Sequence, residues 1–454
     1  MVQARGDVSG AAGGSPLVGL SGWGRSCVVP GVEVRSEDLE EATRGAALTR
    51  GLGRSYGDAS LPPRPGARVA SSLLADRVLA FDAATGVLRA EAGLSLADLN
   101  RLLLRRGWFT PVSPGTQFVT LGGMVAADVH GKNHHRDGSF GAHVRRLRLR
   151  AGNGEVVGCG GSENPELFRA TLGGMGLTGH ILEVELQMRA VPSPWIRQEL
   201  ERAGDLDTLL SRLREAGARW PYTVAWVDCF ARGRAFGRGV VTGGRFAERD
   251  EAPDRPPPKK GRVTLPVDLP GWALNRWTGR AFYEAFYRIQ RRGSRIVHPE
   301  AFFYPLDALL HWNRLYGRRG FTQFQCVLPD TGDLRPARRV FELLASLGVR
   351  PFLAVVKDFG AEGHGLLSFP RPGFTLALDF PVAEGRTQGI VDHLNECVLA
   401  HGGRVYLAKD AFSRPEHFRA MEPRLGEWGR VRDKWDPERR LRSALSVRLF
   451  GDEP

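Results

Sequence analysis

The sequence contains little cysteine and little lysine, and it has no long hydrophobic run. Its five cysteines show neither the paired spacing of a zinc site nor that of a disulfide framework. No apolar segment approaches the roughly 18 uncharged residues that would indicate a membrane-spanning helix. The chain also lacks the charged and apolar opening of a signal peptide, so we expect a cytoplasmic protein or one that binds a membrane peripherally.

Lysine is scarce because almost all basic residues are arginine. The chain has 63 Lys plus Arg against 50 Asp plus Glu, a net charge of +13, and six of these basic residues are lysine. A surface of this charge favours phosphate groups, anionic lipids or nucleic acid. Codon bias also produces an arginine-rich composition. The few lysines are therefore informative, because an ammonium whose pKa shifts easily has a chemistry that a guanidinium lacks.

The length of 454 residues predicts about two or three domains. Residues 1–17 are rich in Gly, Ala and Ser, and we expect them to be disordered. From residue 18 to 191, short β-like runs alternate with glycine-rich turns, and Ser95 with Asp98 predicts the start of a helix that Gly107 ends. Residues 192–403 are expected to form a sheet covered by helices, and residues 404–454 a C-terminal segment.

Three glycine-rich segments lie in the first of these domains. They are 50–58 (RGLGRSYGD), 114–124 (PGTQFVTLGGM) and 173–179 (GGMGLTG). Residues without a Cβ let backbone N–H groups approach a pyrophosphate closely. The first segment differs from the Rossmann fingerprint in its spacing, and the prolines that follow it exclude a helix there. Each segment alone is also typical of an ordinary turn, but together they indicate a long phosphate-bearing cofactor between strands.

A polar cluster follows the second segment and contains Asp128, His130, His134 and His135. A metal site is one interpretation of this cluster. However, the histidines lack a fixed helical or strand offset, and no further Cys or Glu ligand is evident. We therefore expect no metal.

Together these motifs resemble the FAD-binding domain of the vanillyl-alcohol oxidase superfamily, the PCMH type. The resemblance rests on 53–58, 114–116, 121–123, 128–135 and 138–141. It is closest to the decaprenylphosphoryl-β-D-ribose 2-oxidases, the flavin subunits of ribose-to-arabinose epimerases, and it continues through 303–307, 312–317, 323–325, 367–370 and 402–410. The implied fold class is α+β, with a two-subdomain FAD-binding domain over residues 18–191, an α/β substrate domain with a large antiparallel sheet, and a C-terminal segment that returns to the FAD domain.

The resemblance also implies roles for individual residues, with FAD bound noncovalently. The cofactor-binding residues that it implies are Arg50, Gly51, Leu52, Gly53, Arg54, Ser55, Tyr56, Gly57, Asp58, Gly115, Thr116, Thr120, Leu121, Gly122, Gly123, Ala127, Asp128, Val129, His130, Ile181 and Tyr406. The implied substrate residues are Lys132, Gln323, Gln325, Lys357, Ala377 and Lys409, and the implied catalytic residues are Lys409, His130 and Tyr56. The argument from scarce lysines selects Lys409 independently.

The implied reaction is oxidation of the 2-hydroxyl of a polyprenylphosphoryl-β-D-ribose to the 2-keto sugar, the first half of epimerisation to the arabinose donor for cell-wall polysaccharide. His130, Lys409 or ordered water would take the hydroxyl proton, and the sequence leaves these alternatives open. The family further implies a short-chain ketoreductase as partner and oxygen or quinone as electron acceptor. The alternative is a same-fold flavin oxidase of a soluble sugar, nucleoside or aldonolactone. No nucleic acid is expected, because no recognition module is evident.

The chain departs from the family pattern at specific places. Ala377 stands where mycobacterial-type enzymes have a cysteine, and Thr375 replaces an asparagine. The reaction does not need that thiol, so we expect activity with an altered pocket. The interval between Val34 and Arg50 is shorter than in the family, which predicts a trimmed helix.

Residues 280–295 interleave aromatic side chains with arginines. Such a segment is typical of a peripheral membrane contact or a phosphate clamp, and equally of a half-buried helix with solvated arginines.

Overall fold

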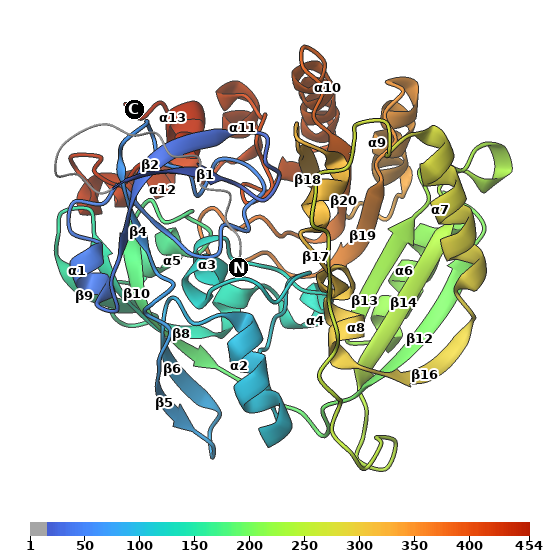
Figure 1. Cartoon of the computed structure of the whole chain (residues 1–454), viewed down its shortest axis with the longest axis horizontal. Helices are drawn as coiled ribbons and strands as arrows, with labels where there is room; N and C mark the ends of the chain where they lie inside the picture. Colours follow the sequence, from blue (N-terminus) through green and yellow to red (C-terminus); the bar gives the residue numbers. More distant parts are fainter. Residues whose placement is uncertain (1–15) are drawn as a thin grey trace.

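The N-terminal part of the chain folds into two sheets, as the computed structural model, which describes residues 16–454, shows (Figure 1). The first sheet has the strand order β1 (Leu17–Ser21), β2 (Val28–Arg35), β4 (Arg68–Ser71), β3 (Leu48–Arg50). The second has the order β5 (Val78–Asp82), β6 (Val87–Glu91), β10 (Gly179–Gln187), β8 (Val144–Ala151), β9 (Val156–Gly160). This pair of sheets is the expected two-subdomain arrangement. The segment expected to be disordered, 1–17, falls almost entirely outside the described residues.

Short helices join these strands. They are α1 (Leu39–Ala42), α2 (Leu96–Leu103), α3 (Leu121–Ala126), α4 (His134–Asp137) and α5 (Pro165–Thr171). The α2 helix begins as predicted, because the Ser95 hydroxyl accepts a hydrogen bond from the backbone N–H of Asp98. Its Leu96, Leu99 and Leu103 are buried. The interval between Val34 and Arg50 contains α1, a helix of four residues.

The second lobe is built on an eight-stranded sheet, on the right in Figure 1. Its strand order is β16 (Gly293–Val297), β12 (Ile196–Ala203), β14 (Gly239–Phe246), β13 (Tyr222–Val227), β19 (Leu353–Phe359), β20 (Gly373–Pro381), β18 (Phe321–Pro329), β21 (Arg404–Val405). Every neighbouring pair in this sheet is antiparallel. The large antiparallel sheet expected for the substrate domain is therefore confirmed.

Helices cover both faces of this sheet. They are α6 (Leu206–Arg219), α7 (Arg276–Ile289), α8 (Pro299–Phe303), α9 (Arg335–Ser346) and α10 (Thr387–Ala400). The apolar stripe of α6 packs against β13 and β14, and α10 packs against β18. Because side chains alternate across a strand, Phe324 and Cys326 face these helices while Gln323 and Gln325 face the first lobe. Two small sheets complete the fold, β7 (Trp108–Phe109) with β11 (Arg189–Ala190) and β15 (Val263–Thr264) with β17 (Leu309–Leu310).

The C-terminal segment packs against the first lobe. It carries α11 (Pro415–Met421), α12 (Leu425–Trp435) and α13 (Ala444–Phe450). The indole N–H of Trp428 donates to the Ala170 carbonyl over 3.1 Å, and Arg448 pairs with Asp58. Strand β21 of this segment ends at Val405, where the chain turns and the Lys409 N–H donates to the Tyr406 carbonyl.

No helix between residues 16 and 454 is both long enough and apolar enough to cross a bilayer.

Candidate active site

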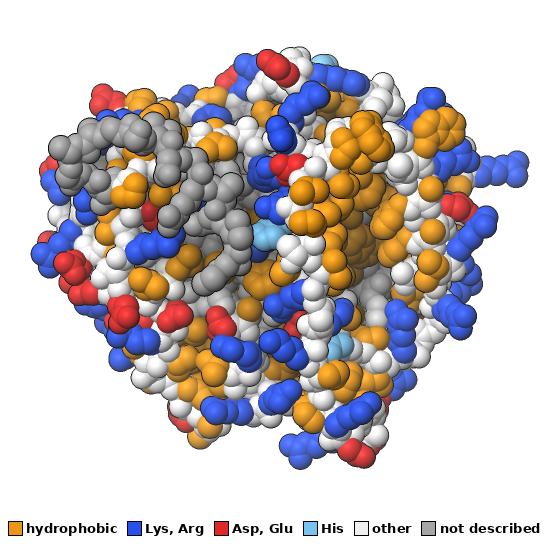
Figure 2. Space-filling view, in the orientation of Figure 1, with side chains coloured by type: hydrophobic (Ala, Val, Ile, Leu, Met, Phe, Trp, Pro, Cys, Tyr) orange, Lys and Arg blue, Asp and Glu red, His pale blue; other side chains and the backbone are white. Residues whose placement is uncertain are grey.

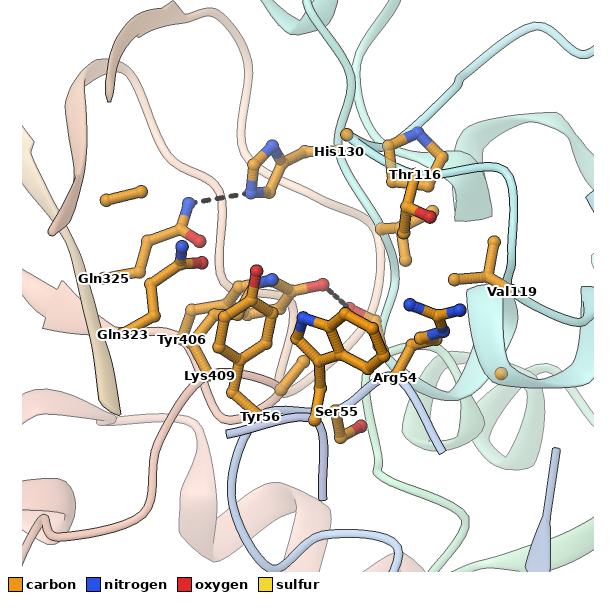
Figure 3. A pocket seen from close by; sticks show the side chains of 18 of the residues that line it. Arg54, Ser55, Tyr56, Thr116, Val119, His130, Gln323, Gln325, Tyr406 and Lys409 are labelled. Carbon is orange, nitrogen blue, oxygen red and sulfur yellow. Dashed lines mark hydrogen bonds between the residues drawn. The ribbon is translucent and has the colours of Figure 1, made fainter. Parts of the chain in front are cut away.

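A cavity of about 280 Å³ lies between the two lobes. One wall comes from the glycine-rich segments of the first lobe and the other from the eight-stranded sheet and the C-terminal segment, as Figure 3 shows. Polar side chains from both walls point into it, among them His130, Gln325 and Lys409. Residues from motifs that lie far apart in the sequence therefore meet at this one cavity.

The wall formed by the first lobe presents bare backbone to this cavity. Gly51, Gly53, Gly115 and Gly123 line it. A Cβ added at Gly115 would meet no atom within 4 Å, so this backbone faces open space. Thr120 caps the start of α3 by accepting from the Gly123 N–H. Unblocked backbone beside a cavity fits a pyrophosphate, which needs close approach of N–H donors.

Arg54 supplies a positive charge to the same wall. Its guanidinium lies 3.8 Å from the centroid of the Trp23 ring and 5.2 Å from that of Phe118. Burial lowers its pKa. It forms no hydrogen bond or ion pair with any other residue in the range 16–454. A buried guanidinium without an acidic partner is a favourable position for a phosphate group.

The strand register of the eight-stranded sheet determines which side chains form the opposite wall of the cavity. Gln325 is paired with Ala377, which is paired with Val355, which is paired with Trp226. Directly paired residues of antiparallel strands share a face, so all four side chains point into the cavity, and each of them lines it. Lys357 lies two residues from Val355 and therefore on the same face.

His130 connects the two walls. The Gln325 side-chain amide donates to His130 Nε2 over 2.9 Å (Figure 3). Lys357 Nζ lies 3.2 Å from Nδ1 of the same ring. Burial lowers the pKa of His130 well below its usual value, and Lys357 lowers it further. Burial likewise lowers the pKa of Lys357, with Lys132 and Lys409 adding to the shift. Burial therefore disfavours charge on both side chains of this hydrogen-bonded pair.

Lys409 is the cation nearest the tyrosine of the first motif. Its ammonium lies 3.6 Å from the centroid of the Tyr56 ring. Burial lowers the pKa of Lys409, and the carboxylate of Asp379 opposes that shift. Asp379 is fully buried, and Gln323 donates to its Oδ1. The Oδ2 atom has no hydrogen-bond partner within residues 16–454. Burial raises the pKa of this carboxyl, and the protonation states of Lys409 and Asp379 depend on each other.

Lys132 lies beside α8 on the wall of the cavity. Its ammonium donates to the Phe303 carbonyl over 2.9 Å and lies 5.8 Å from the centroid of the Phe302 ring. Burial lowers its pKa to about 8. Three lysines of the few in this chain therefore meet at one cavity, Lys132, Lys357 and Lys409.

Most of the residues that the sequence indicated line this cavity. From the cofactor set, these are Gly51, Leu52, Gly53, Arg54, Ser55, Tyr56, Gly115, Thr116, Thr120, Gly123, Ala127, Val129, His130 and Tyr406. All six of the expected substrate residues also line it: Lys132, Gln323, Gln325, Lys357, Ala377 and Lys409. The seven that do not line it are Arg50, Gly57, Asp58, Leu121, Gly122, Asp128 and Ile181.

The residues outside the cavity support its walls. The Arg50 guanidinium donates to the carbonyls of Ser21 and Ser60, and Asp58 accepts two hydrogen bonds from Arg448. Asp128 accepts from the Gly141 N–H and from the hydroxyls of Ser139 and Ser368. Because Ser368 belongs to the second lobe, Asp128 holds the two lobes together directly behind His130.

The histidines of the polar cluster have separate partners. His134 Nδ1 accepts from the Gly360 N–H over 3.3 Å, and His135 Nε2 lies 3.0 Å from the Trp220 carbonyl. Burial lowers the pKa of His134 to about 3. No group of three metal-ligating side chains occurs anywhere in the described part of the chain.

The departures from the family pattern lie at this site. Ala377 lines the cavity. The Thr375 hydroxyl accepts from the Gln325 amide over 3.1 Å and donates to the Cys326 carbonyl over 2.9 Å. Thr375 therefore orients Gln325 and, through it, His130.

Sequence reasoning missed several residues of the cavity. Trp23, Trp226, Asp307, Trp312 and Val355 line it, and Asp379 lies buried behind Gln323. For Asp379 a signal existed, since it follows Ala377 by two residues on one strand and so shares its face. The aromatic residues carried no such signal, because tryptophans in strands and turns are typical of an ordinary core.

Comparison with known proteins agrees with this arrangement. A family described as FAD binding domain matches residues 39–160. Over 453 residues the chain is 36% identical to decaprenylphosphoryl-β-D-ribose oxidase of Mycolicibacterium smegmatis, covering 95% of this chain and 97% of that protein.

Two further relatives differ in how much of this chain they match. An uncharacterized protein of Streptomyces coelicolor is 34% identical over 368 residues, which is 78% of this chain and 100% of that protein. A D-arabinono-1,4-lactone oxidase of Yarrowia lipolytica is 25% identical over 202 residues, which is 44% of this chain and 34% of that protein. Similarity to the lactone oxidase is therefore partial, whereas similarity to the ribose oxidase extends through both lobes.

Proposed function

This chain belongs to the decaprenylphosphoryl-β-D-ribose oxidase family of FAD-dependent oxidoreductases, and from that premise we propose that it oxidises the 2-hydroxyl of a polyprenylphosphoryl-β-D-ribose to the 2-keto sugar. The observation that carries the proposal is that Lys409, His130 and the glycine-rich backbone line one cavity. The product would be the substrate of a partner ketoreductase, and oxygen or a quinone would reoxidise the enzyme. Together the two reactions would epimerise ribose to arabinose for a cell-wall polysaccharide.

The first lobe would hold FAD without a covalent bond. The backbone of 51–56, with Gly115 and Gly123, would surround the pyrophosphate, and Arg54 would neutralise its charge. His130 is already engaged by Gln325 and Lys357, so it serves the cavity as a hydrogen-bonding side chain rather than as a tether. When bound, FAD supplies the acceptor for the hydride of the sugar alcohol.

Lys409 is the residue that we assign as the proton acceptor. Its lowered pKa gives it a neutral amine near physiological pH, and this amine can take the proton of the 2-hydroxyl as hydride leaves the carbon. Lys409 then becomes a cation at the moment when negative charge arises in the cavity, and it stabilises that charge. The face of the Tyr56 ring, 3.6 Å away, favours the protonated form.

Gln323, Gln325 and Lys132 would bind the sugar. Gln323 and Gln325 lie two residues apart on β18 and so present two amides side by side toward the cavity. Amides both donate and accept, as recognition of ribose hydroxyls requires. Ala377 leaves more room beside them than a cysteine would.

A prenylated substrate also requires contact with a membrane. The segment 280–295 would provide this contact, because it contains most of α7 and the first residues of β16, the strand at the edge of the sheet. Its arginines would bind anionic headgroups.

The direct test is anaerobic reduction of the bound flavin. A prenylphosphoryl-β-D-ribose should bleach the absorbance of the oxidised flavin, and free ribose should not. Lys409→Ala should retain FAD but lose the bleaching. If a free sugar, a nucleoside or an aldonolactone bleaches the flavin and the prenylphosphoryl ribose does not, the alternative oxidase function replaces this one.

A further inference from the structure

Helix α7 exposes an apolar stripe. Trp277, Phe282 and Ile289 are 64%, 46% and 72% exposed, while Gly279 and Tyr283 of the same helix are buried. Phe282 and Ile289, seven residues apart, lie on one face of the helix and form this stripe, whereas Trp277 projects from another side. Trp272, just before the helix, is 75% exposed. Large apolar side chains in such a contiguous stripe mark a surface that contacts something other than water.

Positive charge borders this stripe. Glu284 is paired with Arg238 and Arg288, which neutralises the acidic position of the helix. Five arginines form no ion pair with any residue in the described range 16–454: Arg276, Arg280, Arg291, Arg292 and Arg295. An apolar stripe with unpaired arginines at its border has the composition of a helix that lies at a membrane interface.

A tract of aromatic side chains connects this helix with the cavity. Trp226 lines the cavity and packs against Phe286 of α7, with ring centroids 6.0 Å apart. Phe286 stacks on Phe282 at 6.0 Å, and Phe282 stacks on Phe352 at 5.4 Å. The tract therefore begins at the cavity wall and ends at a half-exposed side chain of the apolar stripe.

The surface is hollowed where this tract reaches it. Figure 2 shows a deep recess among hydrophobic side chains, between α7 and the segment that carries β17. Hydrophobic atoms line its floor as well as its rim in this view. A recess lined in this way can accept an apolar chain.

We propose that the aromatic tract of Trp226, Phe286, Phe282 and Phe352 binds the prenyl chain of the substrate, which enters along α7 while the outer stripe of that helix lies in the membrane interface. This inference rests on the proposed function for the identity of the ligand. It adds a binding site for the apolar chain, separate from the residues that surround the sugar. The enzyme would then draw the phosphoribosyl end into the cavity without removing the whole lipid from the bilayer.

The test compares two substrates that differ only in chain length. Geranylphosphoryl-β-D-ribose is too short to fill the tract, whereas decaprenylphosphoryl-β-D-ribose fills it and continues into the bilayer. In Phe282→Glu, we expect KM for the decaprenyl substrate to rise about tenfold and KM for the geranyl substrate to stay unchanged. The matched control is Leu102→Glu on α2, where an exposed leucine lies in the other lobe and the tract is untouched. Flavin absorbance and Tm of each variant show that it folds and binds FAD.

Membrane contact is measured separately, with vesicles that contain phosphatidylglycerol. Ile289→Glu should reduce co-sedimentation at least fivefold relative to wild type and to Leu102→Glu. The tract inference is overturned if Phe282→Glu changes KM equally for both substrates or for neither. It is also overturned if Ile289→Glu binds vesicles as wild type does. If neither substrate bleaches the flavin of the wild-type enzyme, the proposed function itself fails, which is a distinguishable result.

Discussion

The ammonium of Lys409 lies 3.6 Å from the centroid of the Tyr56 ring. Tyr56 belongs to the first glycine-rich segment and Lys409 to the turn after β21, so the two come from opposite ends of the chain. A ring face stabilises the ammonium, and burial favours the neutral amine. The net effect is a lysine whose pKa is lowered, at the centre of the cavity.

This relationship predicts the pH dependence of flavin reduction. Because burial lowers the pKa of Lys409, the neutral amine that accepts the proton increases as pH rises through that lowered pKa. The reduction rate should therefore rise with pH and level off well below the usual lysine pKa of about 10.5. Stopped-flow reduction by substrate, measured without oxygen between about pH 5 and pH 10, gives the profile. Lys409→Arg should reduce the rate and remove the rise. A profile that falls with pH would exclude Lys409 as the base.

Asp379 should determine the pH at which the rate of flavin reduction rises. Its carboxylate raises the pKa of Lys409 against the effect of burial. In Asp379→Asn the opposing charge is absent, so the rise should shift to lower pH by about one unit. The same stopped-flow series measures the shift, and Glu166→Gln, at an exposed pair with Lys434, is the control. An unchanged profile would show that Asp379 serves only to orient Gln323.

Because position 377 carries an alanine, we can predict how the protein responds to thiol-directed inhibitors. Inhibitors that trap a cysteine at this position should not label the wild-type protein, because Cys326 is buried on the opposite face of the sheet and an alanine lines the cavity. Ala377→Cys should gain one adduct per flavin after turnover. Mass spectrometry of the intact protein detects the adduct. Labelling of the wild type in the cavity would contradict this prediction.

Substitutions at Arg54 and Asp58 should have different effects, the first on FAD binding and the second on stability. Arg54→Ala removes the unpaired guanidinium of the cavity wall, so we expect FAD to dissociate about tenfold more readily. Asp58→Asn removes one of the two carboxylates that pair with Arg448, which keeps Asp410, so it should lower the free energy of unfolding by about 2 kcal/mol. Fluorescence titration of FAD and denaturant unfolding measure the two quantities. If Asp58→Asn weakens FAD binding as strongly as Arg54→Ala, then Asp58 contributes to the cofactor site directly.

The sequence allowed us to predict those parts of the site whose local requirements leave a pattern in the residues. Glycine-rich segments indicate close approach to a ligand, and these segments do line the cavity. The scarcity of lysine made Lys409 conspicuous, and it lies at the centre of the site. The α2 helix was predictable because its cap and its apolar spacing are local features.

Other features depend on contacts between distant residues and leave no local pattern. Asp58 belongs to a cofactor-binding motif, yet its carboxylate faces Arg448, which comes 390 residues later. The register between β18 and β20 decides that Asp379 shares a face with Gln323, and a register is fixed by tertiary packing. The aromatic tract combines residues of β13 and α7 with Phe352, and only the folded chain makes it continuous.

The return of the C-terminal segment has a consequence for biosynthesis. Tyr406 and Lys409 complete the cavity, and the Tyr406 hydroxyl donates to the Ala127 carbonyl of the first lobe. The ribosome makes these residues long after the glycine-rich segments, so a nascent chain that has already formed the glycine-rich wall still lacks the other side of its site. The cavity would therefore be complete only after synthesis has passed Lys409 and the C-terminal segment has packed on the first lobe.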